Sequence, residues 1–124
     1  MFRRFFAKHE VHKTPRPGIC PPIIVDEQGT ATVFESIEDA ERYLEPIDVR
    51  NEEYVAYDSE GRLLRLLPTS PRITIENAEL EPRHSSEVRD LLIRLLNYSG
   101  HAVEKLQREN LADLVTMSLE YKTK

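Results

Sequence analysis

The chain has little cysteine and little glycine. Its 124 residues include one cysteine, Cys20, and four glycines. A single cysteine cannot form an internal disulfide, which agrees with a reducing compartment. The sequence also has no glycine-rich phosphate loop, no Gly-x-Ser-x-Gly elbow, no His-Glu-x-x-His and no cysteine pair with zinc spacing. The sequence therefore gives no support to the enzyme classes that these motifs indicate.

Long hydrophobic runs are absent as well. No apolar stretch approaches the roughly 18 residues of a membrane-spanning helix, so no membrane span is expected. The first eight residues lack the apolar stretch and small-residue cleavage site of a secretory signal. Apolar residues make up 40% and charged residues 31% of the chain, which is ordinary for a globular domain of this length. We therefore expect a soluble protein of the cytoplasm.

Basic residues are scarce in the second quarter of the chain. Residues 26–60 hold twelve acidic side chains and two basic ones, a net charge of −10. Residues 1–16 carry +4 and residues 61–124 carry +1. An acidic block can steer a cationic partner over a Debye length of about 8 Å, whereas it repels phosphates. A basic protein partner is therefore favoured, and nucleic acid is an unlikely direct partner of the domain.

Proline marks one boundary. Four of the eight prolines lie within residues 14–22, where they disfavour a helix or a central strand. We divide the chain into a basic, proline-rich N-terminal arm, 1–22, and a single domain, 23–124. Within the arm, Phe2, Phe5 and Phe6 stand among basic residues at nearly helical spacing. Three outcomes remain open for them: docking on the domain, binding an anionic surface, or fraying.

The residue pattern in the first part of the domain predicts two strands and a helix. β-branched runs indicate strands at 23–25 and 31–34, separated by a turn that contains Gly29. Ser36 is typical of a helix N-cap, and the spacing predicts a helix over 37–45 that Pro46 ends. Its apolar stripe is predicted to consist of Ile37, Ala40 and Leu44. The residues predicted to face outward are Glu38, Glu41, Arg42 and Glu45.

A hairpin follows over 53–57 and 62–67. The turn from Asp58 to Gly61 fits a type I turn with a bulge, because Gly61 falls where the backbone needs a positive φ. This register puts Ala56 opposite Leu64 and Tyr54 opposite Leu66. The other face, which includes Tyr57 and Leu67, is mixed, so another element covers it or a partner can use it. A further strand is predicted over 72–76.

The last third of the domain is helical in pattern. An apolar stripe from Val88 to Leu96 predicts a helix that begins at a Ser85 or Ser86 cap and ends before a left-handed Gly100. A second helical pattern runs over 102–121, with a break or new cap at Asn110. Residues 115–122 also alternate with period two, so a terminal strand competes, but we favour the helix. The predicted fold is α+β: a small, mainly antiparallel sheet with a short helix and a C-terminal helical pair packed on it.

Candidate catalytic or metal-binding residues are few. His9 and His12 share H-x-x-H spacing without a third ligand, and Cys20 is a lone thiol in a proline-rich segment. The residue types of a Ser-His-Asp catalytic triad occur at His84, Ser85, Ser86 and Asp90. A helix cap explains these residues more simply. The acidic residues lack the spacing that wraps calcium. We predict no catalytic residue, no metal and no cofactor.

These observations favour a small, bacterial-type, non-enzymatic binding protein. It would present an acidic surface to a basic protein partner such as a nuclease toxin, as immunity proteins and antitoxins do. The residues predicted to form that surface are Glu38, Glu41, Glu45, Asp48, Glu52 and Glu53. Two alternatives remain. One is a small hydrolase or metal-dependent enzyme with His84, Ser85 or the acids in a cleft; the other is a homo-oligomeric module, such as a homodimer, built on the hairpin face around Tyr57 and Leu67.

Overall fold

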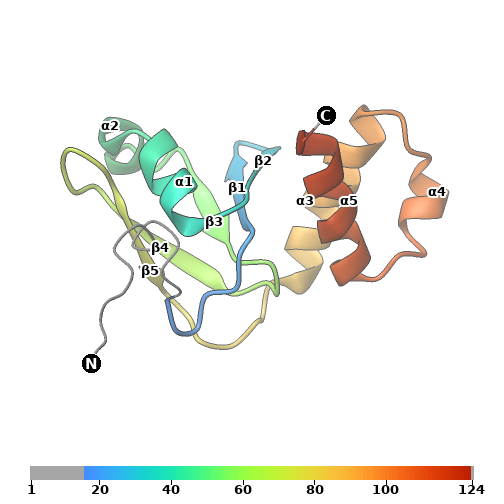
Figure 1. The fold of residues 1–124 in the computed structure, drawn as a ribbon, viewed down its shortest axis with the longest axis horizontal. Coiled ribbons are helices and arrows are strands. Elements are labelled where there is room, and N and C mark those ends of the chain that lie inside the picture. Colours follow the sequence, from blue (N-terminus) through green and yellow to red (C-terminus); the bar gives the residue numbers. More distant parts are fainter. Residues whose placement is uncertain (1–15, 124) are drawn as a thin grey trace, which may run out of the picture.

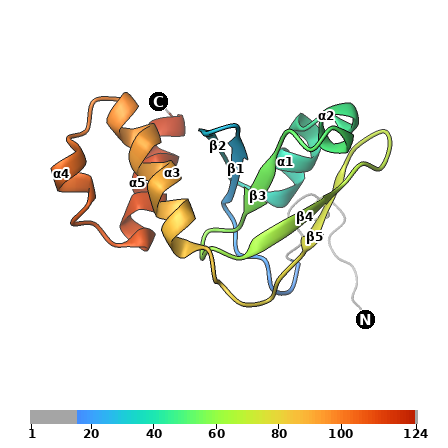
Figure 2. The same ribbon diagram turned by 180° about the vertical axis from the view of Figure 1, so that it is seen from behind.

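A five-stranded antiparallel sheet lies between two groups of helices (Figures 1 and 2). The computed structural model describes residues 16–123, and side chains for 16–121. The strands, in sheet order β2-β1-β3-β4-β5, are β1 (Ile23–Glu27), β2 (Thr30–Phe34), β3 (Val55–Tyr57), β4 (Leu63–Leu67) and β5 (Thr74–Asn77). The helices are α1 (Ile37–Tyr43), α2 (Pro46–Arg50), α3 (Ser85–Tyr98), α4 (Val103–Leu106) and α5 (Leu111–Thr123). The predicted α+β class, antiparallel sheet and C-terminal helical pair are confirmed.

Each face of the sheet contributes to a core of its own. In β1, Ile23 and Val25 join a core with α1 and α2, while Ile24 points to a second core with α3 and α5. All three side chains are at most 1% exposed. Because β1 is covered on both faces at these positions, its first three residues form a continuous apolar run instead of an alternating one. Figure 1 shows α1 and α2 on one side of the sheet and α3 and α5 on the other.

The first hairpin confirms both predicted strands and extends them. Gln28 and Gly29 form its two-residue loop with φ values of 54° and 97°. Two consecutive positive φ values are those of a type I′ turn, which matches the twist of paired strands. The side chain of Asp26 supports the loop by accepting a hydrogen bond of 2.6 Å from the N–H of Gly29.

The predicted N-cap of α1 is confirmed, and a second short helix was not predicted. The Ser36 hydroxyl accepts a hydrogen bond from the N–H of Asp39 at 3.1 Å. α1 ends at Tyr43, two residues earlier than expected. Pro46 then stands at the first position of α2. A proline fits that position because the first N–H groups of a helix have no intrahelical partner.

The second hairpin has the predicted turn and a shorter first strand. The N–H of Gly61 donates to Asp58 O at 3.2 Å, and Gly61 has a φ of 96°. Ala56 pairs with Leu64 as predicted. β3 begins only at Val55, so the predicted pair of Tyr54 and Leu66 lies beyond the strand, although both side chains pack against the core that contains Ala56 and Leu64. The predicted strand over 72–76 is present as β5, which begins and ends later.

The C-terminal third is helical, as favoured over the strand alternative. The Asn110 side chain accepts a hydrogen bond of 2.8 Å from the N–H of Asp113 and so caps α5. Gly100 has the predicted positive φ, 115°. The predicted serine cap of α3 is wrong: Ser85 and Ser86 are its first two residues, and the N-cap residue is His84, whose side chain makes no capping hydrogen bond.

The end of the predicted N-terminal arm packs against the domain. Ile19 is 7% exposed and belongs to the same core as α1. Pro22 is buried as well. The phenylalanines of the arm, together with His9 and His12, lie outside the described residues, and so do the three outcomes left open for them.

Gly61 provides a test of how the second hairpin meets α3. A Cβ built at Gly61 would lie 2.6 Å from the backbone N of Ser85, whereas one at Gly100 would meet nothing within 4 Å. Both residues have a positive φ, so Gly100→Ala isolates the backbone strain, about 1 kcal/mol. We expect Gly61→Ala to destabilise more, on the order of 3 kcal/mol, in urea unfolding. Equal losses for the two variants would contradict the close approach.

Candidate functional site

The acidic block splits into paired and outward-facing carboxylates. Arg62 forms ion pairs with Asp58 at 3.1 Å and Glu60 at 2.7 Å. Asp39 pairs with Arg42 at 3.0 Å. These ion pairs engage Asp39, Asp58 and Glu60, and the candidate site lies among the other acids of the block.

Glu41 is buried, so the prediction that it faces outward is wrong. Its residue is 7% exposed, and its carboxylate binds Arg16 through both oxygens. The same carboxylate accepts a hydrogen bond of 2.7 Å from the N–H of Ile75. The hydrogen bond to Glu41 raises the pKa of Arg16, so the guanidinium stays charged. Position 41 lies four residues after Ile37 and three before Leu44, which places it on the buried stripe.

The other five predicted acids form no ion pair with any described residue, and four of them gather at α2. We call Glu45, Asp48, Glu52 and Glu53 the α2 acidic segment. Glu45 and Glu52 are exposed, and Asp48 and Glu53 are half-buried. Glu38 lies apart on α1, where its charge acts on Arg16. Of the cations nearest in sequence, Arg50 is exposed and Arg42 is paired with Asp39.

The charges of three carboxylates of this region act on one tyrosine hydroxyl. Tyr54 donates a hydrogen bond of 3.2 Å to Asp48. Burial, this hydrogen bond, and the charges of Asp48, Glu27 and Glu53 raise the pKa of Tyr54 to about 12. Glu27 comes from the tip of the first hairpin, 26 positions before Glu53. The negative potential is therefore shared by two segments that are distant in sequence.

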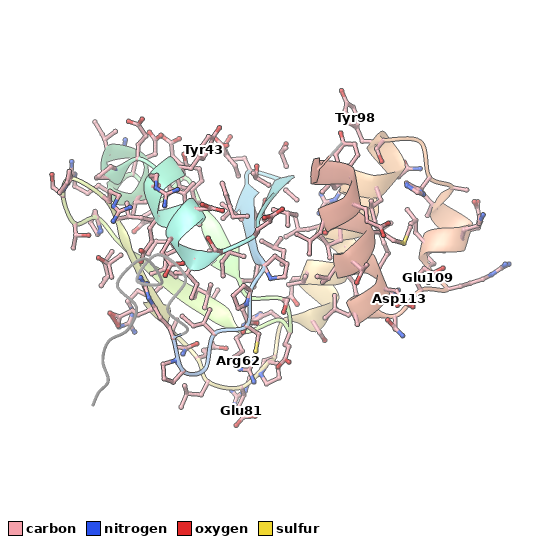
Figure 3. All side chains as sticks on the ribbon, viewed as in Figure 1. Tyr43, Arg62, Glu81, Tyr98, Glu109 and Asp113 are labelled. Carbon is pink, nitrogen blue, oxygen red and sulfur yellow. The ribbon has the colours of Figure 1, made fainter. Side chains whose placement is uncertain are left out.

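Two exposed apolar side chains accompany the α2 acidic segment, one just before it and one within it. Tyr43 is 69% exposed and Ile47 is 56% exposed. The Tyr43 ring packs on Phe34 with 5.4 Å between ring centroids and 47° between planes. Figure 3 places Tyr43 on the α1–α2 side of the molecule, away from Glu109 and Asp113 of the C-terminal helices. We call Tyr43, Ile47 and the α2 acidic segment together the α1–α2 face.

The residues of the triad alternative do not converge. The His84 ring contacts Glu79 through Nε2 at 3.1 Å and Glu87 through Nδ1 at 3.4 Å. Ser86 donates its hydroxyl to Glu87 at 3.1 Å, and neither serine contacts the imidazole. Both nitrogens of His84 thus face carboxylates, an arrangement that gives neither serine a base.

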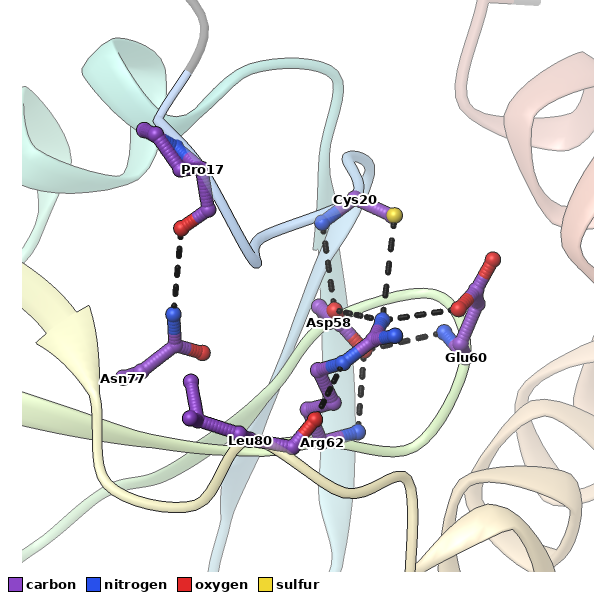
Figure 4. A network of polar contacts seen from close by, with 7 residues as sticks. All are labelled: Pro17, Cys20, Asp58, Glu60, Arg62, Asn77 and Leu80. Atoms are coloured by element: carbon purple, nitrogen blue, oxygen red, sulfur yellow. Dashed lines mark hydrogen bonds and ion pairs between the residues drawn. The ribbon is translucent and has the colours of Figure 1, made fainter.

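Cys20 belongs to a structural network around Asp58 (Figure 4). Asp58 is fully buried and accepts hydrogen bonds from the N–H groups of Cys20 at 3.1 Å, Glu60 at 3.0 Å and Arg62 at 2.9 Å. The Arg62 guanidinium reaches the Cys20 sulfur at 3.8 Å and Leu80 O at 2.8 Å. Burial is the main cause that raises the pKa of the Cys20 thiol, which disfavours the nucleophilic thiolate.

The hairpin face of the homo-oligomer alternative is partly covered. Tyr57 is 8% exposed and lies in the core with α3 and α5. Leu67 is half-buried. Val55 is 43% exposed, and the Arg65 side chain, which pairs with Glu76 at 3.4 Å, is exposed too. The face is therefore open around Val55 and Arg65 and closed at Tyr57.

The comparisons with known proteins add no family. Searches of protein-family models, curated proteins and solved structures found no match. Within the part of the chain that the structure describes, no three histidine, cysteine, aspartate or glutamate side chains are grouped so that they could hold a metal ion. Over those same residues, no helix has the length and apolar character needed to cross a membrane.

The sequence predicted the acidic residues of the α1–α2 face but not its apolar ones. The run of acids indicated the charge, but Tyr43 was not singled out, because its exposure depends on where α1 ends. Ile47 lies on α2, which the sequence pattern did not predict. The signal that could have found α2 was Pro46 followed by Asp48, because a proline and an acid are both favoured in the first turn of a helix.

The pKa of Tyr54 tests whether the carboxylates converge. We expect ¹³C NMR of labelled tyrosine to show Tyr54 ionising near pH 12, and Asp48→Asn to lower this midpoint because a hydrogen bond and a charge are removed. Since the folded pKa lies above the ordinary value of 10, the stabilising contribution of this group is lost as pH rises from 10 through 12. Asp90→Asn serves as the control. An unchanged midpoint in Asp48→Asn would contradict the arrangement.

Proposed function

We propose that this protein is a non-enzymatic binding protein whose α1–α2 face docks on a basic protein partner. The observation that supports this best is the α2 acidic segment, four carboxylates without an ion pair to any described residue, beside the exposed Tyr43 and Ile47. We further propose that it acts in the cytoplasm as an immunity-like or antitoxin-like inhibitor. The basic surface of a nuclease toxin is the kind of target that this charge suits.

The two kinds of side chain on the face have separate roles in this proposal. Carboxylates without a bound cation produce a field that speeds encounter with a cationic surface and selects against anionic ones. Tyr43 and Ile47 supply apolar area that a partner can cover. Tyrosine is enriched among the residues that carry binding energy, and Tyr43 already rests on Phe34, so less side-chain entropy is lost on binding.

The structure changes the set of residues on which the proposal depends. Glu41 leaves the set because its carboxylate is engaged inside the molecule by Arg16 and Ile75. Glu38 stays a contributor to the field, on the side nearer Arg16. Glu45, Asp48, Glu52 and Glu53 remain as the charge complement.

Charge reversal on the face tests the proposal. The partner is captured from the native host with the full chain, identified by mass spectrometry, purified and titrated by calorimetry. We expect it to be a basic protein, and Glu45→Lys/Glu52→Lys/Glu53→Lys to weaken binding at least tenfold, about 1.4 kcal/mol. The matched control is Glu81→Lys/Asp90→Lys/Glu104→Lys, which makes the same charge change at other exposed acids. Equal losses for the two triple variants would contradict a specific acidic face.

Substitutions of Tyr43 test whether the partner makes apolar contacts with the face or is held by charge alone. We expect Tyr43→Ala to weaken binding of the same purified partner by about 1–2 kcal/mol, because a buried aromatic contact is lost. Tyr43→Phe should bind like the wild type if the ring area matters and the hydroxyl does not. The titrations are repeated at low and high salt. Binding that depends on salt but not on Tyr43 would show that charge alone acts.

A further inference from the structure

The N-terminal arm meets the domain at α1, the helix that carries part of the α1–α2 face. Arg16 is the first described residue, and its guanidinium binds the Glu41 carboxylate of α1. The charge of Glu38, one turn earlier on the same helix, also acts on Arg16. Tyr43 follows Glu41 by two positions. Residues 1–15 are therefore tethered next to the face.

The arm and the face carry opposite charges of the same size. Residues 1–15 contain four basic side chains and one acidic one, a net charge of +3. Residues 43–54 contain the four carboxylates of the α2 acidic segment and one basic side chain, a net charge of −3. These carboxylates form no ion pair with a described residue. Charges of opposite sign that are held near each other attract, and the attraction weakens as salt is added.

The apolar side chains of the arm and of the face also match. Phe2, Phe5 and Phe6 stand among the basic residues of the arm. Tyr43 and Ile47 stand among the acidic residues of the face and are 69% and 56% exposed. Contact between the two sets removes apolar surface from water, and aromatic rings add a favourable pair geometry. Both the charge and the apolar area of the face thus have a counterpart in the same chain.

The tether is long enough and raises the local concentration of the arm. Fifteen residues can span up to about 50 Å, whereas the twelve residues of α1 and α2 together rise only about 18 Å. A short linker gives an effective concentration on the order of millimolar. A contact with a Kd of about 1 mM is therefore half-occupied within one chain, although separate molecules would not form it at micromolar concentration.

We propose that residues 2–13 of the N-terminal arm dock on the α1–α2 face of the same chain. The basic side chains of the arm lie against the α2 acidic segment, and its phenylalanines cover Tyr43 and Ile47. The consequence of this docking rests on the proposed function. The arm offers the same positive charge and apolar area as the basic partner, so it competes with that partner for the face.

Carbodiimide cross-linking of the full chain tests the docking. The reagent joins a lysine amine to a carboxylate in direct contact, and about 5 µM protein lies far below the effective concentration within one chain. In the monomer band, mass spectrometry should find amides from Lys8 or Lys13 to the α2 acidic segment. Their yield should exceed that of amides to Glu81 at least about tenfold, and high salt should reduce it.

Glu81 is the matched control because it is an exposed acid near another part of the arm. It follows Leu80, and a Cβ built at Gly18 would lie 3.7 Å from the Leu80 side chain. Figure 3 shows Glu81 well apart from Tyr43. Equal yields at Glu81 and at the α2 acidic segment would overturn the proposal. Amides confined to a dimer band would assign the face to the arm of a second copy and would overturn it as well.

Methyl NMR of the full chain tests the apolar contact. We expect Phe2→Ser/Phe5→Ser/Phe6→Ser to shift the resonance of the Ile47 δ1 methyl group, because the ring currents of docked phenylalanines are removed. The Leu80 methyl groups, which are also on an exposed side chain, should not move. An unchanged Ile47 resonance, or an equal shift at Leu80, would contradict docking of the phenylalanines on the face.

Partner titration separates this inference from the proposed function. Arg3→Ala/Arg4→Ala/Lys8→Ala should bind the purified basic partner about threefold or more tightly than the wild type, because the face is free in a larger fraction of molecules. An equal affinity would overturn the competition. If charge reversal on the face leaves partner binding unchanged, the proposed function fails, whereas the cross-links, which need no partner, still decide whether the arm docks.

Discussion

The buried ion pair between Arg16 and Glu41 joins three parts of the chain that are far apart in sequence. It connects the N-terminal segment to α1 and, through Ile75, to the outer strand of the sheet. A buried carboxylate without its cation costs several kcal/mol, so Arg16 stabilises the packing of α1 on the sheet. The segment that follows Arg16 must then run along the same core, where Ile19 is buried.

A second buried carboxylate continues this chain of constraints. Once Ile19 is in the core, the N–H of Cys20 reaches Asp58, which also holds the turn of the second hairpin. The O of Gly61 in that turn accepts a hydrogen bond of 2.9 Å from the N–H of His84, immediately before α3. Both helical layers are therefore linked to one turn, and at Gly61 the turn approaches Ser85 too closely to leave room for a Cβ.

Features set by neighbours in sequence were predicted, and those set by distant partners were not. The Ser36 cap, the Asp58–Gly61 turn and the Asn110 cap each depend on residues within four positions, and all three were found. By contrast, the partner of Glu41 lies 25 residues away, and nothing local indicates it. α2 was missed because a proline can end one helix and begin another, and the choice depends on packing.

The candidate site shows the same limit in terms of charge. A count over residues 26–60 treats all twelve acids alike, yet Glu41 and Asp58 are buried structural groups while Glu45 and Glu52 are exposed. Helical spacing could have separated Glu41 from its neighbours, since it falls on the apolar stripe. No spacing could have separated the others, because their environment depends on strands that meet α2 only in the fold. Buried acids hold the domain together with arginines from outside the block, and four of the acids that form no ion pair with a described residue lie at α2.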